Sequence, residues 1–410
     1  GFDSREDLMS CCFRKLQFLK VTCILKIIME DKLNIKDSLL ERFLKYVKIW
    51  SESDSQKADS GIMPSTSGQN EMASVLCAES KMEDVGIIQK EVSGKNVNPK
   101  IHKNYSGGKI ILCGAELDPQ KDSALSLAAK NVETIIMGDG TTLLGADDKA
   151  GVAEIVSCLE YLLSHPELKH PAIEVIFSPD EETGHGMDKV PLELLKSKCA
   201  YTVDGGHIGE LETECFNAFR SDVVFKGNAT HTGTARGTMV NAISMASSFV
   251  SNLPAGERPE TTDGRQGFFA PISIEGSIEE SKVSLLLRDF SADGMEKRKS
   301  TVELLAKAVS ELFGGKAEVL HTQQYLNMKE NLDKNPKVAE RLISAYKASG
   351  IEPVFTPIRG GTDGSRLTEM GIPCPNIFTG GHNFHSRNEW ASLDQMIKAV
   401  EVLVHLCCGE

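Results

Sequence analysis

The sequence lacks several features that would assign it at once to a common class of protein. It has no surplus of positive charge: its 58 acidic residues outnumber 45 lysines and arginines, and the net charge of −13 argues against nucleic-acid binding. It also lacks an apolar run of the roughly 20 residues that span a bilayer. The longest candidate, Phe18–Ile28, is short and is interrupted by Lys20 and Lys26. We therefore expect neither a nucleic-acid partner nor a membrane partner.

The cysteines lack a pattern. There are 11 of them, none in a Cys-x-x-Cys motif, and several lie in apolar runs, where a thiol packs as a small hydrophobic side chain. A reducing, cytoplasmic location is the simplest interpretation. Internal repeats and long low-complexity segments are not visible either.

A chain of 410 residues exceeds one ordinary core, so we expect two domains. Residues 29–213 and 323–410 alternate strand and helix patterns, whereas residues 214–322 have an α+β pattern of their own. This alternation predicts an α/β catalytic domain, with a mixed sheet and helices on both faces, interrupted by an inserted α+β domain. Residues 1–28 are predicted to be a non-native leader, with the native chain beginning at Met29.

Hydrophobic periodicity predicts the individual elements. Helices are expected at residues 39–49, 69–81, 239–252, 295–313, 335–348 and 393–406, and strands at residues 172–177, 221–226, 270–275, 282–290 and 377–379.

The most informative stretch is Gly140–Gly151, in which Asp147 and Asp148 precede an amphipathic helical run. The apolar positions of that run predict one buried face: Val152, Ile155, Val156, Leu159, Leu162 and Leu163. Two acids before a helix are most often a cap, because helix N-termini favour negative charge. Other acidic and histidine motifs downstream favour a site instead.

Four clusters offer carboxylates or an imidazole next to strand-like or helix-opening segments: Asp147-Asp148, Asp180-Glu181-Glu182, Asp204 and His385. Open α/β folds place ligand sites at the carboxyl ends of their strands, so the four clusters are expected to meet at one edge. Carboxylates and imidazole without thiolate suit zinc, manganese or cobalt in a catalytic site.

In this arrangement the chain resembles the peptidase T (tripeptide aminopeptidase) branch of the dinuclear-zinc exopeptidases related to carboxypeptidase G. The matching stretches extend from about Met29 to the end: Pro64-Ser65-Thr66 with Gly68-Gln69, Thr141–Gly151, Ser178–Gly186, Val203–Glu212, His231–Asn241, Arg288–Phe290, Arg359–Asp363 and Gly380–Glu389.

The resemblance implies two zinc ions per subunit in the family. Asp147 would bridge them, Glu182 and His385 would complete one site, and Asp204 would serve the other. Glu181 would be the general base, which passes a proton from water to the leaving amine.

The inserted domain would be a lid that forms a homodimer. The resemblance implies that His231 reaches the partner subunit's site and steadies the oxyanion. Asn241, Arg288 and Arg359 match positions that hold the terminal carboxylate of a short peptide substrate. His185, His207 and His382 lie beside the motifs and are interpreted as ordinary polar loop residues.

One family element is missing. A strand ending in His-x-Asp should precede Asp147 and supply the histidine of the Asp204 site, but none of the ten histidines has an aspartate two residues later. The block expected between the Asp84-Val85-Gly86 region and Ser93–Val97 is missing with it. We therefore expect one tightly bound ion in this chain. His102, the only histidine upstream of Asp147, is not favoured as a substitute for the missing histidine ligand.

The sequence thus predicts a zinc-dependent tripeptide aminopeptidase that is impaired at one metal position. A related dipeptidase or N-acyl amino-acid deacylase is an alternative. A third hypothesis is a non-catalytic remnant that dimerises through an intact lid.

Overall fold

The computed structural model describes residues 35–80 and 96–409. The expected leader (1–28) lies outside the described residues, as does most of the region in which the missing block was expected. The described chain has two compact units. Unit 1 comprises residues up to Leu211, Asn335–Phe355 and Cys374–Glu410, and unit 2 comprises Glu212–Lys334 and Thr356–Pro373. The inserted domain was expected to span residues 214–322; unit 2 extends further and includes a second segment.

The first described part of unit 1 is helical, as predicted. Residues 35–46 form a helix, and the helix predicted at residues 69–81 is also present. Asp54 caps the short helix between them by accepting a hydrogen bond from the backbone N–H of Lys57. These later helices are α2 (Ser55–Asp59) and α3 (Ser67–Ser80).

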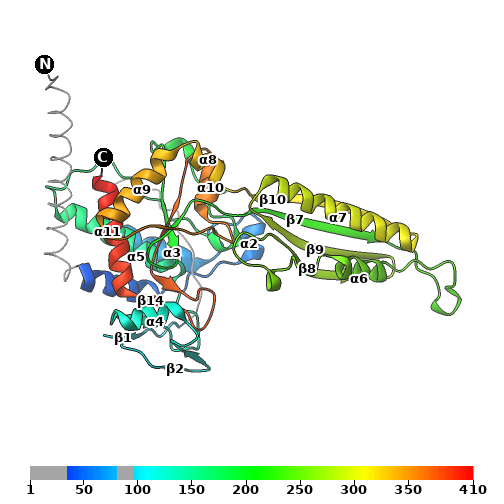
Figure 1. The fold of residues 1–410 in the computed structure, drawn as a ribbon, viewed down its shortest axis with the longest axis horizontal. Helices are drawn as coiled ribbons and strands as arrows, with labels where there is room; N and C mark the ends of the chain where they lie inside the picture. Colours follow the sequence, from blue (N-terminus) through cyan, green and yellow to red (C-terminus); the bar gives the residue numbers. More distant parts are fainter. Residues whose placement is uncertain (1–34, 81–95, 410) are drawn as a thin grey trace, which may run out of the picture. The chain divides into compact units, whose positions relative to one another are not determined.

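Helix α5 (Ala146–Ser164) is the central element of unit 1, and it carries Asp147 in its first turn. We expected one buried face, but most of the helix is buried, while Leu163 on the predicted face is 70% exposed. Helix α11 (Leu393–Cys408) packs along α5, as Figure 1 shows. Strand β5 (Thr202–Gly205) lies so close that a Cβ at Gly151 would be 1.9 Å from the Val203 carbonyl oxygen. Glycine is therefore required at this crossing.

The strands of unit 1 are short and divided among separate sheets. One antiparallel sheet has the order β1-β4-β14-β13, and a second sheet has the order β11-β6-β12-β5, in which β12 runs parallel to β5. A hairpin, β2-β3, stands apart. The remaining bounds are β1 (Lys100–His102), β2 (Ile110–Leu112), β3 (Ala115–Leu117), β4 (Ile135–Met137), β6 (Glu210–Glu212), β11 (Val354–Phe355), β12 (Asn376–Phe378), β13 (Gly381–His382) and β14 (Trp390–Ser392).

The predicted strand at residues 172–177 is not formed, and this prediction was wrong. No strand of the described chain pairs with this β-branched run. Within it, the Glu174 carboxylate accepts hydrogen bonds from the backbone N–H groups of Lys196 and Ser197 instead. A β-strand needs a hydrogen-bonded neighbour, so an apolar run without one stays irregular.

Further helices and a common core complete unit 1. The core joins buried residues of α5 and α11 to the segment 35–47, for example Val156, Val400 and Phe43. The α/β class agrees with the prediction, although the strands do not form one mixed sheet. The remaining helices are α4 (Ser123–Lys130) and α9 (Pro336–Ala348), and the 3-10 turns are η1 (Glu181–Thr183) and η2 (Leu192–Leu194).

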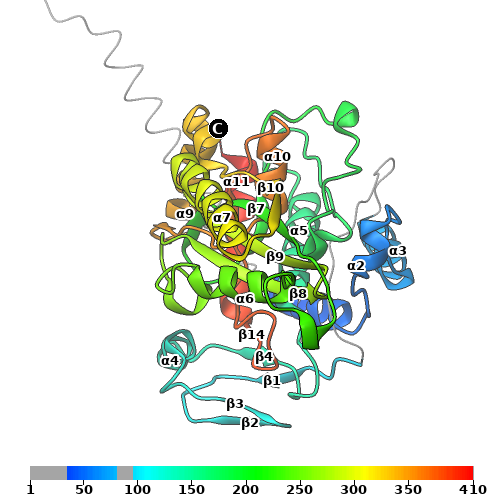
Figure 2. The ribbon, with the colours of Figure 1, turned by 90° about the vertical axis from the view of Figure 1, so that its right-hand side faces the viewer.

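Unit 2 contains one continuous antiparallel sheet with the order β10-β7-β9-β8. Helices α6 and α7 lie over the same face of this sheet, where Val223, Phe225 and Leu285 are fully buried (Figure 2). The predicted strands and helices of this region are confirmed. Their bounds are β7 (Asn217–Lys226), β8 (Phe268–Gly276), β9 (Glu280–Asp289), β10 (Lys316–Tyr325), α6 (Ala242–Asn252), α7 (Ala292–Phe313), α8 (Lys329–Asp333), α10 (Asp363–Glu369), η3 (Thr232–Thr234) and η4 (Pro259–Thr261).

Throughout residues 35–80 and 96–409, every helix is too short or too polar to cross a membrane.

Candidate metal centre

Three of the predicted metal ligands meet in unit 1. Asp147 lies in the first turn of α5, Glu182 in η1, and His385 in the loop after β13. The His385 Nε2 atom is 3.0 Å from Asp147 Oδ2 and 3.3 Å from Glu182 Oε2. One ligand atom from each residue lies within 4.8 Å of the other two, so a single ion could contact all three.

The charges of this group suit a cation. Hydrogen bonds to Asp147 and Glu182 raise the pKa of His385 to about 11, because an imidazolium between two carboxylates is strongly favoured. A divalent cation satisfies the same two carboxylates and leaves the imidazole neutral as a ligand. The donor set therefore fits zinc or a similar ion.

A buried carboxylate, Glu389, holds the loop before Asp147. Glu389 is 1% exposed, and it accepts hydrogen bonds from the backbone N–H groups of Leu144 (2.8 Å), Gly145 (2.9 Å) and Asp147 (3.1 Å). Burial raises the pKa of Glu389 to about 7, although the three N–H donors act in the opposite direction. Glu389 lies at the end of the matching stretch Gly380–Glu389, but the motif predicted no role for it.

A second buried carboxylate, Asp180, holds the turn that carries Glu181 and Glu182. It is fully buried and accepts hydrogen bonds from Ser53, Ser65 and Gln69. The Pro64–Gln69 stretch thus contributes to the site by fixing Asp180. Both Asp180 (φ 60°) and His385 (φ 58°) have left-handed backbone, which non-glycine residues rarely adopt and which is frequent at functional sites.

Asp204 and Glu181 are not part of the three-residue group. Asp204 is half-buried in β5, and Glu181 is half-buried next to Glu182. His102 lies in the exposed strand β1, outside the group as well. Within the described residues, no other set of three histidine, cysteine or acidic side chains has this geometry.

In unit 2, the predicted substrate-binding residues Asn241 and Arg288 are engaged with their own fold. The Asn241 Oδ1 atom caps α6 by accepting from the N–H groups of Ile243 and Ser244. Arg288 is 9% exposed and donates to the carbonyl oxygens of Phe219 and Leu287. Burial lowers the pKa of Arg288.

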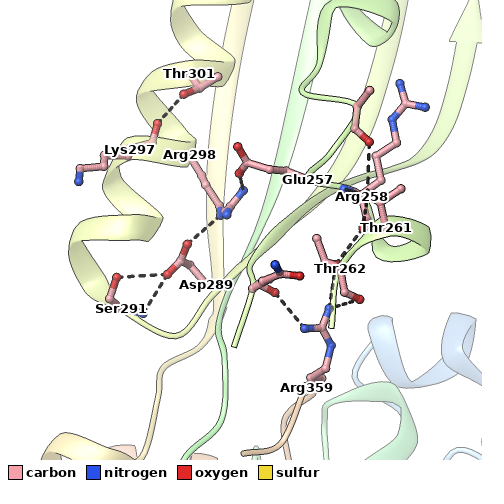
Figure 3. A network of polar contacts seen from close by, with 12 residues as sticks. Glu257, Arg258, Thr261, Thr262, Asp289, Ser291, Lys297, Arg298, Thr301 and Arg359 are labelled. Carbon is pink, nitrogen blue, oxygen red and sulfur yellow. Dashed lines mark hydrogen bonds and ion pairs between the residues drawn. The ribbon is translucent and has the colours of Figure 1, made fainter. Parts of the chain in front are cut away.

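Arg359 binds a loop of unit 2, as Figure 3 shows. Its guanidinium donates to the carbonyl oxygens of Gly264 and Gln266 (both 2.9 Å) and to Thr262 Oγ1 (2.9 Å). It also lies over the rings of Phe216 and Phe268. Nearby, Arg298 pairs with Asp289 and Glu257 in the same network.

His231 differs from these residues because it is exposed at the start of η3. Its Nδ1 atom accepts a hydrogen bond from the backbone N–H of Gly233 (3.2 Å).

The interpretation of His382 as an ordinary polar loop residue was wrong. His382 belongs to β13, is 3% exposed and stacks on Trp390 with ring centroids 3.9 Å apart. Burial lowers its pKa to about 3, so the ring is neutral and behaves as a core aromatic side chain. Its sequence position, directly before the loop that carries His385, gave no sign of this burial.

Comparison with known proteins identifies relatives of nearly full length. A family model described as peptidase family M20/M25/M40 matches residues 128–408. The Peptidase T of Clostridium perfringens (strain SM101 / Type A) is 43% identical over 399 residues, and the alignment covers 89% of this chain and 97% of the relative. Since 89% of 410 residues is about 365, roughly 34 of the 399 aligned positions have no residue in this chain.

Solved structures share the fold. A tripeptidase from Staphylococcus aureus has a TM-score of 0.70 at 19% identity, covering 91% of this chain and 97% of that chain. A Bacillus subtilis protein described as a dinuclear metal binding peptidase has a TM-score of 0.57 at 14% identity, covering 92% of this chain and 98% of that chain.

Proposed function

The chain belongs to peptidase family M20/M25/M40, and from this membership we propose that it is a metal-dependent aminopeptidase that releases the N-terminal residue of tripeptides. The Asp147–Glu182–His385 group carries the proposal, because it places two carboxylates and an imidazole around one point. The 43% identity to a Peptidase T supports a short peptide as the substrate.

The residues of the group would hold one zinc ion. Bound zinc supplies a Lewis acid that polarises the scissile carbonyl and lowers the pKa of a bound water. Glu181, adjacent to Glu182 but outside the group, is the proposed general base: it takes a proton from the attacking water and delivers it to the leaving amine.

We further propose that this chain holds one ion tightly rather than two. A second ion would have Asp147 and Asp204 as ligands, without the histidine of the missing motif, and two carboxylates alone bind zinc weakly. The roughly 34 aligned positions that this chain lacks support this proposal. Activity is then expected to be well below that of a relative with both ions.

Unit 2 is the proposed lid and dimerisation domain, with His231 serving the partner subunit's site. Asn241, Arg288 and Arg359 are proposed to contact the terminal carboxylate of the substrate. Sedimentation at micromolar concentration tests the dimer, and a chain that stays monomeric contradicts it. Seven cysteines of the described chain are free thiols, which supports a cytoplasmic location.

A non-catalytic, dimeric remnant is the second candidate function. Two features of the described chain favour it: only one three-residue group could hold a metal ion, and segment 172–177 has no partner strand. A dipeptidase or an N-acyl amino-acid deacylase of the same fold is a further alternative. The discriminating observation is whether hydrolysis requires a free α-amino group on the substrate.

The decisive experiment measures zinc content after dialysis together with hydrolysis of trialanine and N-acetyl-trialanine. We expect about one zinc ion per chain and slow cleavage of the free tripeptide only. Two retained ions with rapid cleavage would contradict the impaired site, and metal without any turnover would favour the remnant.

Glu181→Gln distinguishes the roles of the two adjacent glutamates. The variant should keep its metal and lose activity, because the amide keeps the shape of the side chain but accepts no proton. Loss of metal would show that the roles of Glu181 and Glu182 are exchanged.

A further inference from the structure

One buried side chain connects the two loops that bring Asp147 and His385 together. Glu389 follows His385 by four positions, and its carboxylate contacts backbone that precedes it by 242 to 245 positions. We propose that Glu389 is a positioning residue that sets the metal affinity of the Asp147–Glu182–His385 group. This inference rests on the metal-dependent function proposed above.

Glu389 holds the turn that leads into α5. Its Oε2 atom accepts hydrogen bonds from the N–H groups of Leu144 and Gly145, and its Oε1 atom accepts one from the N–H of Asp147. Asp147 and Asp148 have non-helical backbone, so the regular part of α5 begins after them, and Asp148 caps it by accepting from the N–H of Gly151. Glu389 therefore fixes the segment just before the regular helix, the segment in which Asp147 lies.

The loop between His385 and Glu389 is internally bonded, so the position of one residue restrains the other. The backbone N–H of Glu389 donates to the Ser386 carbonyl, and the N–H of Asn388 donates to Ser386 Oγ. Asn383 closes the loop by donating from Nδ2 to the Asn388 carbonyl. His385 is thereby part of a short turn that is held together by hydrogen bonds and ends at Glu389.

Glu389 therefore restrains both residues of the contact between Asp147 and His385. On one side it fixes the backbone N–H of Asp147, whose Oδ2 atom lies 3.0 Å from His385 Nε2. On the other side it anchors the turn that carries His385. A site whose ligands are held at their binding separation loses little freedom when an ion binds, and outer partners of ligands typically contribute 10- to 100-fold to metal affinity.

The test compares Glu389→Gln and Glu389→Asp with a matched control, Asp394→Asn. Asp394 is also a carboxylate of unit 1 that accepts a backbone N–H, that of Thr134 (2.7 Å), and it pairs with Lys36 (3.3 Å) instead of with a ligand loop. Glutamine keeps the side-chain length and one acceptor oxygen, yet it turns an NH₂ group toward an N–H donor. Aspartate keeps the charge but is one methylene too short to reach residues 144–147 in the same way.

Zinc affinity of the full chain is measured by competition with a chromogenic chelator. We expect roughly 10- to 100-fold weaker binding in both Glu389 variants and a change within about twofold in Asp394→Asn. Wild-type affinity in Glu389→Gln would overturn the inference, and so would an equal loss in the control. A wild-type chain that binds no zinc would overturn the proposed function as well, so the two failures are distinguishable.

If the Glu389 variants do not fold, amide hydrogen exchange of the metal-free wild-type chain tests whether Glu389 holds the loop before Asp147. The N–H groups of Leu144, Gly145 and Asp147 should exchange slowly, because each is bonded to a buried acceptor. Exchange as fast as in exposed loops would overturn the inference.

Discussion

The candidate site residues of the two units are held in different ways. In unit 1, Asp147, Glu182 and His385 face one another. Glu389 binds the backbone N–H of Asp147, and Asp180 anchors the turn that carries Glu182. In unit 2, the matching residues are themselves bonded to the fold: Asn241 caps a helix, and Arg288 and Arg359 bind backbone carbonyl groups. Residues that match a family motif therefore either face the candidate metal site or hold the fold. Substitution should distinguish the two, because the first should change zinc affinity and the second should change stability.

The largest effect is expected for His385→Ala. The side chain of His385 is 67% exposed but pairs with two carboxylates, so its removal should destabilise the metal-free chain by only about 1 kcal/mol. Zinc affinity should fall by more than the roughly 100-fold typical of outer partners, because a ligand is lost. Calorimetry and chelator competition measure the two quantities. A large loss of metal-free stability would place His385 with the fold-holding residues instead.

A buried histidine of unit 1, His405, should affect the stability of the fold and not zinc binding, and the pH dependence of unfolding can test this. Burial lowers the pKa of His405 to about 4; Glu401 raises this pKa and Lys398 lowers it. The unfolded chain binds the proton near pH 6.5, so stability should fall as pH drops from 6.5 toward 4, by up to about 1.4 kcal/mol per pH unit. Urea unfolding across this range should be less steep in pH for His405→Leu than for the wild type. Parallel curves would contradict the buried, neutral state.

Arg288→Ala should destabilise unit 2 by about 2 kcal/mol, since a buried side chain and its two hydrogen bonds to backbone carbonyls are lost. Zinc affinity should not change. Thermal unfolding gives the first quantity and chelator competition the second. Wild-type stability combined with lost tripeptide hydrolysis would show instead that substrate binding is the main task of Arg288.

Arg359→Lys should have a smaller effect, about 1 kcal/mol, concentrated in the loop that the guanidinium holds. Lysine keeps the charge but cannot bind Thr262, Gly264 and Gln266 together with a planar fork. Faster amide exchange at residues 262–266 is the expected sign. Arg265→Lys is the control, because Arg265 lies in the same loop but is 63% exposed and pairs with the carboxylate of Glu214, which is 11% exposed, instead of with the loop backbone. Equal effects in the two variants would argue against the loop-holding role.

The fold was predictable where periodicity and neighbours agree. Three strands (β7, β8 and β9) and the helices α6 and α7 of unit 2 follow their apolar patterns, and each of these strands has a neighbour in the continuous sheet, whereas the fourth strand, β10, was not predicted. Residues 172–177 have an equally strong strand pattern, yet no partner strand in the described chain. Similarly, Glu154 on α5 is fully buried, and neither carboxylate oxygen has a partner among the described residues. Local sequence cannot report a missing neighbour.

The site was predictable for the side chains that a motif names, but not for those that hold them. Resemblance supplied Asp147, Glu182 and His385 as candidate ligands, and the structure brings these three together. Glu389 and Asp180 act through backbone N–H groups and side chains of distant segments, and no spacing rule relates residues 242 positions apart. An acidic residue within or next to a ligand motif is the sequence signal that could have identified them.

His231 gives the smallest expected effect on stability and the sharpest test of the comparison. It lies in unit 2, but it is exposed and its side chain accepts one local hydrogen bond, from Gly233. In physical terms it resembles His385 rather than Arg288. His231→Ala should therefore change the stability of unit 2 by less than about 0.5 kcal/mol and leave zinc affinity unaltered. If His231 steadies the oxyanion, tripeptide hydrolysis should nevertheless fall by roughly 10²- to 10³-fold in kcat. Unchanged hydrolysis with unchanged stability would remove His231 from the site and leave the residues of unit 2 with structural roles.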